Sequence, residues 1–152
     1  MSFWNSLRIS SSALEAQRIR LDTIANNIAN AETTRTDEGG PYKRQEVVFR
    51  PEGESPTFAS ILASTRSRPP HLNEQVGGVE VAEIVEDEDP GQLVYDPTHP
   101  DADEDGYVLY PNVNLVVEMT NMLSATRSYE ANLAVVDAAK QMAIKALQIG
   151  RS

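Results

Sequence analysis

The first 38 residues contain neither glycine nor proline, and their apolar positions recur with a helical period. Every seventh position in one series is apolar: Leu7, Leu14, Leu21 and Ile28. Ile24 adds an apolar side chain at the intermediate offset. This spacing predicts an amphipathic helix whose apolar stripe forms a coiled-coil-like seam. We expect the helix to end between residues 30 and 34, because Gly39, Gly40 and Pro41 soon forbid it.

A second stretch without glycine or proline runs from Asn112 to Ile149, between Pro111 and Gly150. Two apolar series repeat in it every seven residues or multiples of seven. The first is Leu115, Met122, Tyr129 and Val136, and the second is Met119, Leu133 and Leu147. A helix over this range, capped by Asn112 or Asn114, reaches roughly 55 Å. Because that exceeds the width of a small domain, its seam needs the N-terminal helix, other copies, or both.

The second helix also contains small residues, at Ala131, Ala134, Ala138 and Ala139. Side chains of this size allow the backbone of another helix to approach closely. Together with the length of the helix, they favour subunit contacts in an oligomer over a self-contained two-helix core.

Between the two helices lie short segments with the alternation and β-branched content of strands. They are residues 42–50, 79–85, 93–95 and 107–110. Residues 51–75, which hold four prolines, are expected to form a loop or linker, with a short apolar element at 58–63. The predicted fold class is therefore α+β, with long terminal helices paired as a coiled-coil-like hairpin. We divide the chain into residues 1–34, a β-rich middle at 35–111, and residues 112–152.

The net charge of −10 is unevenly distributed along the chain. Residues 69–126 contain no Lys or Arg and 13 carboxylates, whereas the rest carries 13 basic and 10 acidic residues. An acidic chain is a poor partner for nucleic acid, because phosphate neutralisation requires Lys and Arg. We expect the near-neutral ends to pack against copies of themselves, and the acidic middle to face outward.

The residues required for several other classes of function are missing from the sequence. Zero cysteines exclude disulfides and thiolate chemistry, and two histidines offer little for metal binding or acid–base catalysis. Nucleophile-elbow, phosphate-loop and zinc-protease motifs are absent. No window of 18 apolar residues predicts a membrane span, and the first residues lack the pattern of a cleavable signal peptide. We expect neither an enzyme nor a cofactor-binding protein.

Two acidic segments and one histidine are candidates for a function. Residues 101–106 match the first half of a calcium-binding EF-hand loop, but Asn112 occupies the position that needs a bidentate Glu. A solvated acidic turn is therefore favoured there. The acidic run at 86–89 is expected to face water, with its charge partner left open. His99, which can pair with Asp96 or Asp101, is expected to be structural.

Several short motifs, in this order, resemble those of bacterial flagellar rod and hook proteins. They start with SSSALEAQ at 10–17, IANNIANA at 24–31 and GGPYKR at 39–44. A more specific resemblance, to proteins of the proximal rod, rests on residues 94–97, 99–102, 106–108, 111–114 and 127–132. The motif residues that we single out are Asn26, Asn27, Asn30, Tyr95, Asp96, Pro97, His99, Pro100, Gly106, Tyr107, Pro111 and Asn112.

The resemblance implies an axial structural protein of the flagellar basal body, without catalytic residues, metal or cofactor. It also implies export by the flagellar type III apparatus without signal cleavage, and helical polymerisation across the periplasm to transmit torque. The implied partners are copies of this chain, other proximal and distal rod subunits, and the adaptor protein at the export gate and MS ring. Neither nucleic acid nor membrane insertion is expected.

In the family, the terminal helices form the inner layer of the tube. On that basis the apolar series of both helices, with Ile24, are predicted subunit contacts that become buried mainly on assembly. Asn26, Asn27 and Asn30 either bond across helix ends or between subunits, or mark a solvated helix terminus. The alternative from another class is an acidic cation-binding or adaptor module that acts as a soluble two-helix domain.

Overall fold

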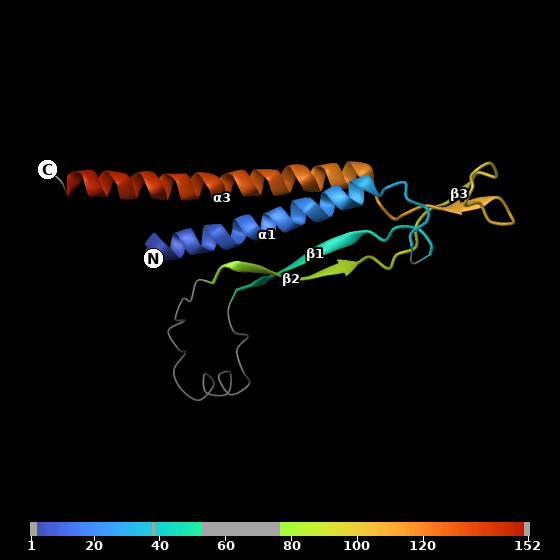
Figure 1. Ribbon diagram of the computed structural model, residues 1–152, viewed down its shortest axis with the longest axis horizontal. Coiled ribbons are helices and arrows are strands. Elements are labelled where there is room, and N and C mark those ends of the chain that lie inside the picture. Colours follow the sequence, from blue (N-terminus) through green and yellow to red (C-terminus); the bar gives the residue numbers. More distant parts are fainter. Residues whose placement is uncertain (1–2, 38, 53–76, 151–152) are drawn as a thin grey trace, which may run out of the picture.

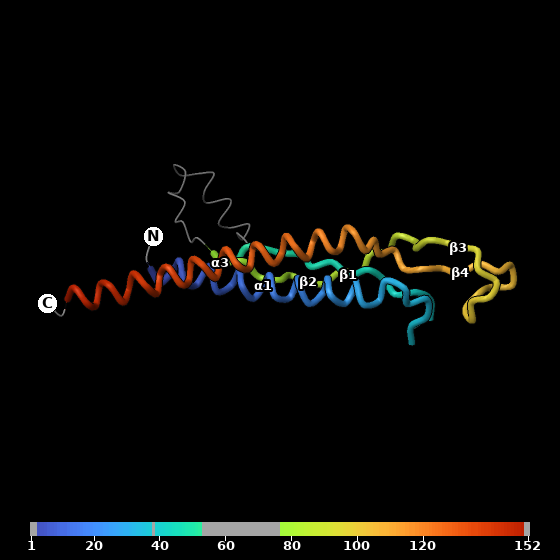
Figure 2. The backbone as a smooth tube through the Cα atoms, turned by 90° about the horizontal axis from the view of Figure 1, so that it is seen from above, coloured from blue at the N-terminus to red at the C-terminus, as the bar shows by residue number. Residues whose placement is uncertain are grey.

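The computed structural model describes residues 3–37, 39–52 and 77–150. Two long helices, α1 (Phe3–Ala29) and α3 (Leu115–Ile149), run antiparallel side by side (Figures 1 and 2). Four strands lie between them in the sequence: β1 (Gln45–Pro51), β2 (Val79–Glu86), β3 (Leu93–Tyr95) and β4 (Tyr107–Leu109). The α+β class with paired terminal helices and a small β-rich middle is thus confirmed. The element expected at 58–63 lies outside the described residues.

The helix ends differ slightly from the sequence prediction. α1 ends at Ala29, one residue before the predicted window. At this end the side-chain amide of Asn30 donates to the backbone carbonyl of Asn26 and closes the last turn. α3 begins at Leu115 rather than Asn112, and Asn114 is its N-cap. The Asn114 side chain accepts hydrogen bonds from the N–H groups of Val116 and Val117, which have no partner within the helix.

The strands form two separate antiparallel pairs, β1 with β2 and β3 with β4. A bulge between Val48 and Phe49 shifts the register of the first pair. β1 begins at Gln45 rather than at residue 42, since Tyr42 instead donates its backbone N–H to Thr33 in the segment after α1. The β3–β4 pair lies beyond the ends of the two helices (Figure 1).

α1 lies between α3 and the β1–β2 pair (Figure 1). Its Ser12 hydroxyl accepts from the backbone N–H of Val79, which places that side of α1 against β2. Ala16 follows one turn later and is buried. Leu14 lies roughly 200° around the helix from both Ser12 and Ala16, and so faces α3. The predicted leucine series of α1 is half-buried along this side, and Ile24 is buried.

Neither apolar series predicted on α3 forms the centre of the α1–α3 seam. On α3 the buried positions are Glu118, Ala125 and Ala139, one residue before the predicted second series. The first series lies at the edge of the seam, where Met122, Tyr129 and Val136 are half-buried, but Leu115 is exposed. The pattern selected large apolar side chains, whereas a closely packed pair of helices buries small ones at its centre. Of the four alanines noted above, only Ala139 is buried.

Candidate assembly interface

A buried polar junction fixes α1 against α3 and the start of β1. Asn27 of α1, only 1% exposed, uses all of its amide capacity. Its Nδ2 donates to the Gln45 carbonyl at 2.8 Å and to Glu118 Oε2 at 3.3 Å. Its Oδ1 accepts from the Tyr42 hydroxyl and from the Gln45 N–H, both at 2.9 Å. Asn27 is therefore not solvated: it bonds within the chain, from the end of α1 to residues 42 and 45 and to α3.

Glu118 is the charged centre of the junction and is also only 1% exposed. Its Oε1 accepts from Arg44 Nε at 2.9 Å and from the Asn121 amide at 3.5 Å. Removing a buried carboxylate from water is costly, and an ion pair offsets that cost only when its remaining lone pairs are also satisfied. The lone pairs of Glu118 are satisfied, because Asn27 donates to its other carboxylate oxygen, Oε2.

The electrostatics of the junction act on Tyr42 and Arg44. Burial raises the pKa of the Tyr42 phenol, and the negative charges of Glu86 and Glu118 raise it further. Burial lowers the pKa of Arg44, but the hydrogen bond and charge of Glu118, with those of Glu46, outweigh it, so the net shift is upward. The charged guanidinium and the neutral phenol are both favoured in the folded chain.

The other two asparagines of the predicted motif have local roles. The Asn30 amide donates to the Asn26 carbonyl, and its oxygen accepts from the Thr33 hydroxyl at 3.2 Å. The side chain of Asn26 is exposed. No contact was predicted from the sequence for Glu118 or for Arg44, which was named only within the motif at 39–44. The signal was present, because Glu118 shares its heptad position with Ala125 and Ala139, where a lone charge interrupts small residues.

The motif residues between 95 and 107 are brought together in the loop of the β3–β4 pair. Tyr95 and Tyr107 pair across the strands, with ring centroids 5.3 Å apart. The Thr98 hydroxyl and backbone N–H both donate to Asp96, which lowers the pKa of that carboxyl. His99 Nδ1 accepts from the backbone N–H of Asp101, so its contact is with the chain itself, in keeping with the structural role expected of it.

The acidic segments have protein partners. In the 101–106 loop, Asp103 Oδ1 accepts from the backbone N–H groups of Asp105 and Tyr107, which makes the segment a turn. In the run at 86–89, Glu86 lies 3.5 Å from Lys43, and Asp87 lies 3.7 Å from Arg44. Lys43 and Arg44, the basic pair that precedes β1, are therefore charge partners of the first two residues of that run, whereas Glu88 and Asp89 are exposed.

α3 presents apolar side chains on the sides that α1 does not cover. Among the predicted contacts, Leu115, Met119, Leu133 and Leu147 are exposed. Other exposed apolar residues of α3 include Val116, Val117, Leu123, Val135, Met142, Ile144 and Ile149. A helix that is apolar around most of its circumference is normally buried on several sides. No helix in the described part of the chain has an apolar stretch sufficient to cross a membrane.

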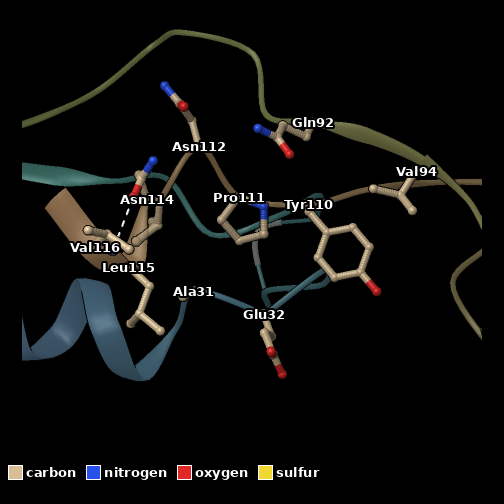
Figure 3. Close-up of a pocket in the computed structure, with 11 residues that line it drawn as sticks. Ala31, Glu32, Gln92, Val94, Tyr110, Pro111, Asn112, Asn114, Leu115 and Val116 are labelled. Atoms are coloured by element: carbon tan, nitrogen blue, oxygen red, sulfur yellow. Dashed lines mark hydrogen bonds between the residues drawn. The ribbon is translucent and has the colours of Figure 1, made fainter. Parts of the chain in front are cut away.

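A groove of about 530 Å³ opens where α3 begins, between α1 and the β3–β4 pair (Figure 3). Ala31, Val94, Pro111, Leu115 and Val116 supply its apolar lining. Glu32, Gln92 and Asn112 add polar groups. Two motif residues, Pro111 and Asn112, thus lie in this groove rather than with Asn27.

Comparison with known proteins identifies both terminal helices. Residues 7–35 match the family model "Flagella basal body rod protein", and residues 104–149 match "Flagellar basal body rod FlgEFG protein C-terminal". The chain is 46% identical to the flagellar basal-body rod protein FlgC of Borreliella burgdorferi, over 98% of each chain. It is 46% identical to that of Bacillus subtilis and 40% identical to that of Salmonella typhimurium, in each case over 99% of this chain and 100% of the relative.

Proposed function

The chain belongs to the FlgC family of flagellar basal-body rod proteins, and we propose that it polymerises helically through α1 and α3. It is a structural subunit of the proximal rod of the basal body, in a family of structural proteins rather than enzymes. It assembles with other flagellar components. The proposal concerns how it does so, and which surfaces it uses.

The exposed apolar surface of α3 is the observation that carries the proposal. Met119 and Leu133 lie away from the intrachain seam, whose centre is Ala125. Each fully buried side chain of this kind contributes about 1.5–3 kcal/mol, so a row of them along one helix strongly favours association. Leu7, Leu14, Leu21 and Ile28, half-buried in one chain, complete their burial in the same contacts.

Two groups of partners follow. The first is further copies of this chain together with proximal and distal rod subunits, which offer matching helices. The second is the adaptor at the export gate and MS ring, at the base of the rod. The type III apparatus delivers the subunit as an extended chain without signal cleavage, and the assembled rod crosses the periplasm and transmits torque.

A single-site experiment tests the role of α3. A Leu133→Asp substitution in the native bacterium introduces a charge on the exposed face without touching the buried junction. We expect the variant to be exported but not incorporated, so that cells lose motility and the subunit is found outside the cytoplasm. Leu133→Met is the matched control, because it keeps an apolar side chain of similar volume. Motile cells carrying Leu133→Asp would contradict the proposal.

The half-buried side of α1 is tested in parallel. Leu21→Asp is expected to block incorporation as well, with Leu21→Met as its control. Since Leu21 also faces α3 within the chain, circular dichroism of the purified variant separates loss of folding from loss of assembly. Normal motility with Leu21→Asp would contradict a role for this series in the rod.

A further inference from the structure

The last turns of α3 extend past the first residue of α1, so that no neighbouring element in the described part of the chain covers them (Figures 1 and 2). Residues 144–149, which we call the overhang, are all exposed. Their apolar members are prominent: Leu147 is 73% exposed and Ile149 is 78% exposed. A helix end of this composition is poorly suited to water.

The groove described above lies at the opposite end of the helix pair, where α1 ends and α3 begins (Figures 1 and 3). Its apolar lining is matched to side chains such as Ile144 and Leu147 of the overhang. Its volume of about 530 Å³ is that of a site for several such side chains. The two ends of one chain cannot meet, because the length of α3 separates them.

The charges of the two surfaces are complementary. Between Asp137 and Gly150 the only charged residues are Lys140 and Lys145, both exposed. The groove carries Glu32, and the β3–β4 loop beside it carries five carboxylates: Asp96, Asp101, Asp103, Glu104 and Asp105. No Lys or Arg occurs between residues 69 and 126, and the one basic side chain seen to offset them in the described part of the chain is Arg35, which lies 3.7 Å from Asp101. The helix end is therefore positive, and the surroundings of the groove remain negative on balance.

The backbone adds a second kind of complementarity. The last carbonyls of a helix lack intrahelical donors, and the end of a helix carries a partial negative charge. The groove includes the first turn of α3, at Leu115 and Val116, where the partial charge is positive. The side-chain amides of Gln92 and Asn112 also line it and can donate to such carbonyls (Figure 3).

We propose that the overhang of one chain docks in the groove of a second copy of this chain, head to tail. The inference rests on the proposed function, and it names the partner and the site for one of the contacts. Because overhang and groove are different surfaces, the contact is heterologous, and each added copy leaves a new groove or overhang for the next. The result is an open series along the direction of α3 rather than a closed pair.

Disulfide trapping tests the contact directly, since the natural chain has no cysteine. Gly150→Cys places a thiol at the end of the overhang, where the backbone φ of −72° accepts a side chain without strain. Gln92→Cys places the other thiol on the groove. Mixing and oxidising the two purified variants is expected to give the mixed disulfide at least tenfold faster than a control pair. The control joins Gly150→Cys with Glu83→Cys, an exposed position on β2.

Charge reversal supplies the second readout. Lys140→Glu with Lys145→Glu in the Gly150→Cys background is expected to reduce the rate to that of the control pair, whereas Arg127→Glu, elsewhere on α3, leaves it unchanged. Equal rates for the groove pair and the control pair overturn the inference, and so does a product that stops at closed dimers when both thiols are on one chain. The rod role is judged separately, by whether the natural chain is present in isolated basal bodies.

Discussion

Asn27 and Glu118 are 91 residues apart in the sequence, yet the Asn27 amide donates to the Glu118 carboxylate at 3.3 Å inside the folded chain. Both side chains are only 1% exposed. The seam around them consists of small residues such as Ala125, which pack closely but specify register weakly. The polar junction supplies that specification, because a shift of one residue along either helix would leave a buried charge without its partners.

Removing the carboxylate should therefore be costly. Glu118→Ala strips Arg44 and Asn27 of an acceptor, and breaking a buried ion pair at one partner costs about 3–5 kcal/mol. Glu118→Gln keeps the shape but not the charge, and should cost less. Glu130→Ala, on an exposed position of α3, is the control, expected within about 0.5 kcal/mol of the natural chain. Urea denaturation measures all three, and a Glu118→Ala variant as stable as the control would contradict the role of the junction.

The phenol of Tyr42 should ionise at unusually high pH. Burial and the charges of Glu86 and Glu118 raise its pKa above 10.0 in the folded chain. A raised pKa stabilises the fold fully below the unfolded value, and this contribution is lost as the pH rises through the folded value. Subtracting the ultraviolet titration of Tyr42→Phe from that of the natural chain isolates this group. Its midpoint should lie above pH 10 when folded and fall toward about 10 in denaturant; identical midpoints would refute the effect.

Gln17 offers a way to stabilise the chain. Its side-chain oxygen is buried and has no hydrogen-bond partner among the described residues. An unsatisfied buried acceptor costs about 1–3 kcal/mol. Gln17→Met conserves volume and removes the carbonyl, so we expect a gain of about 1 kcal/mol in a thermal melt. The same change at the exposed Gln141 should have little effect. Destabilisation by Gln17→Met would mean that the amide is in fact satisfied.

Gly106 is required both by its backbone conformation and by the lack of room for a Cβ atom. Its φ is +82°, and a Cβ there would lie 3.0 Å from the ring of Tyr95. Gly40 has nearly the same φ of +83° but open space around it. Gly40→Ala should therefore cost about 1 kcal/mol for backbone strain alone, and Gly106→Ala more. Urea denaturation of the two variants measures the difference, and equal losses of stability would contradict the steric argument.

The helices could be predicted from sequence because their signals are local. Pro111 and Gly150 bound the segment of α3, the Gly-Gly-Pro sequence at 39–41 follows that of α1 ten residues after its end, and Asn114 was one of two caps proposed for α3. The strands were found to within a few residues for the same reason. The segment 42–44 was assigned to a strand because its composition allows one, whereas tertiary contacts with Thr33 and Glu118 decide its conformation.

The centre of the seam could not be predicted in the same way. Hydrophobic periodicity gives the direction of an apolar stripe. Because α3 has apolar residues on several sides, the periodicity indicated the side of the larger residues Leu133 and Met119 rather than that of Ala125. The junction was missed for a different reason, since Arg44 and Glu118 are 74 residues apart and their pairing depends on the fold. By contrast, Asn27 was singled out through the family motif, although its bonding was left open.

The central claim is that the apolar surface of α3 becomes buried when the rod assembles. Amide hydrogen exchange of α3 in the purified chain and in isolated basal bodies measures this most directly. We expect the peptides at the uncovered end of α3, residues 144–149, to exchange quickly in the free chain and at least a hundredfold more slowly in the rod, whereas peptides around the buried Glu118 are protected in both. Strong protection of residues 144–149 in the free chain, with no further slowing on assembly, would contradict the account.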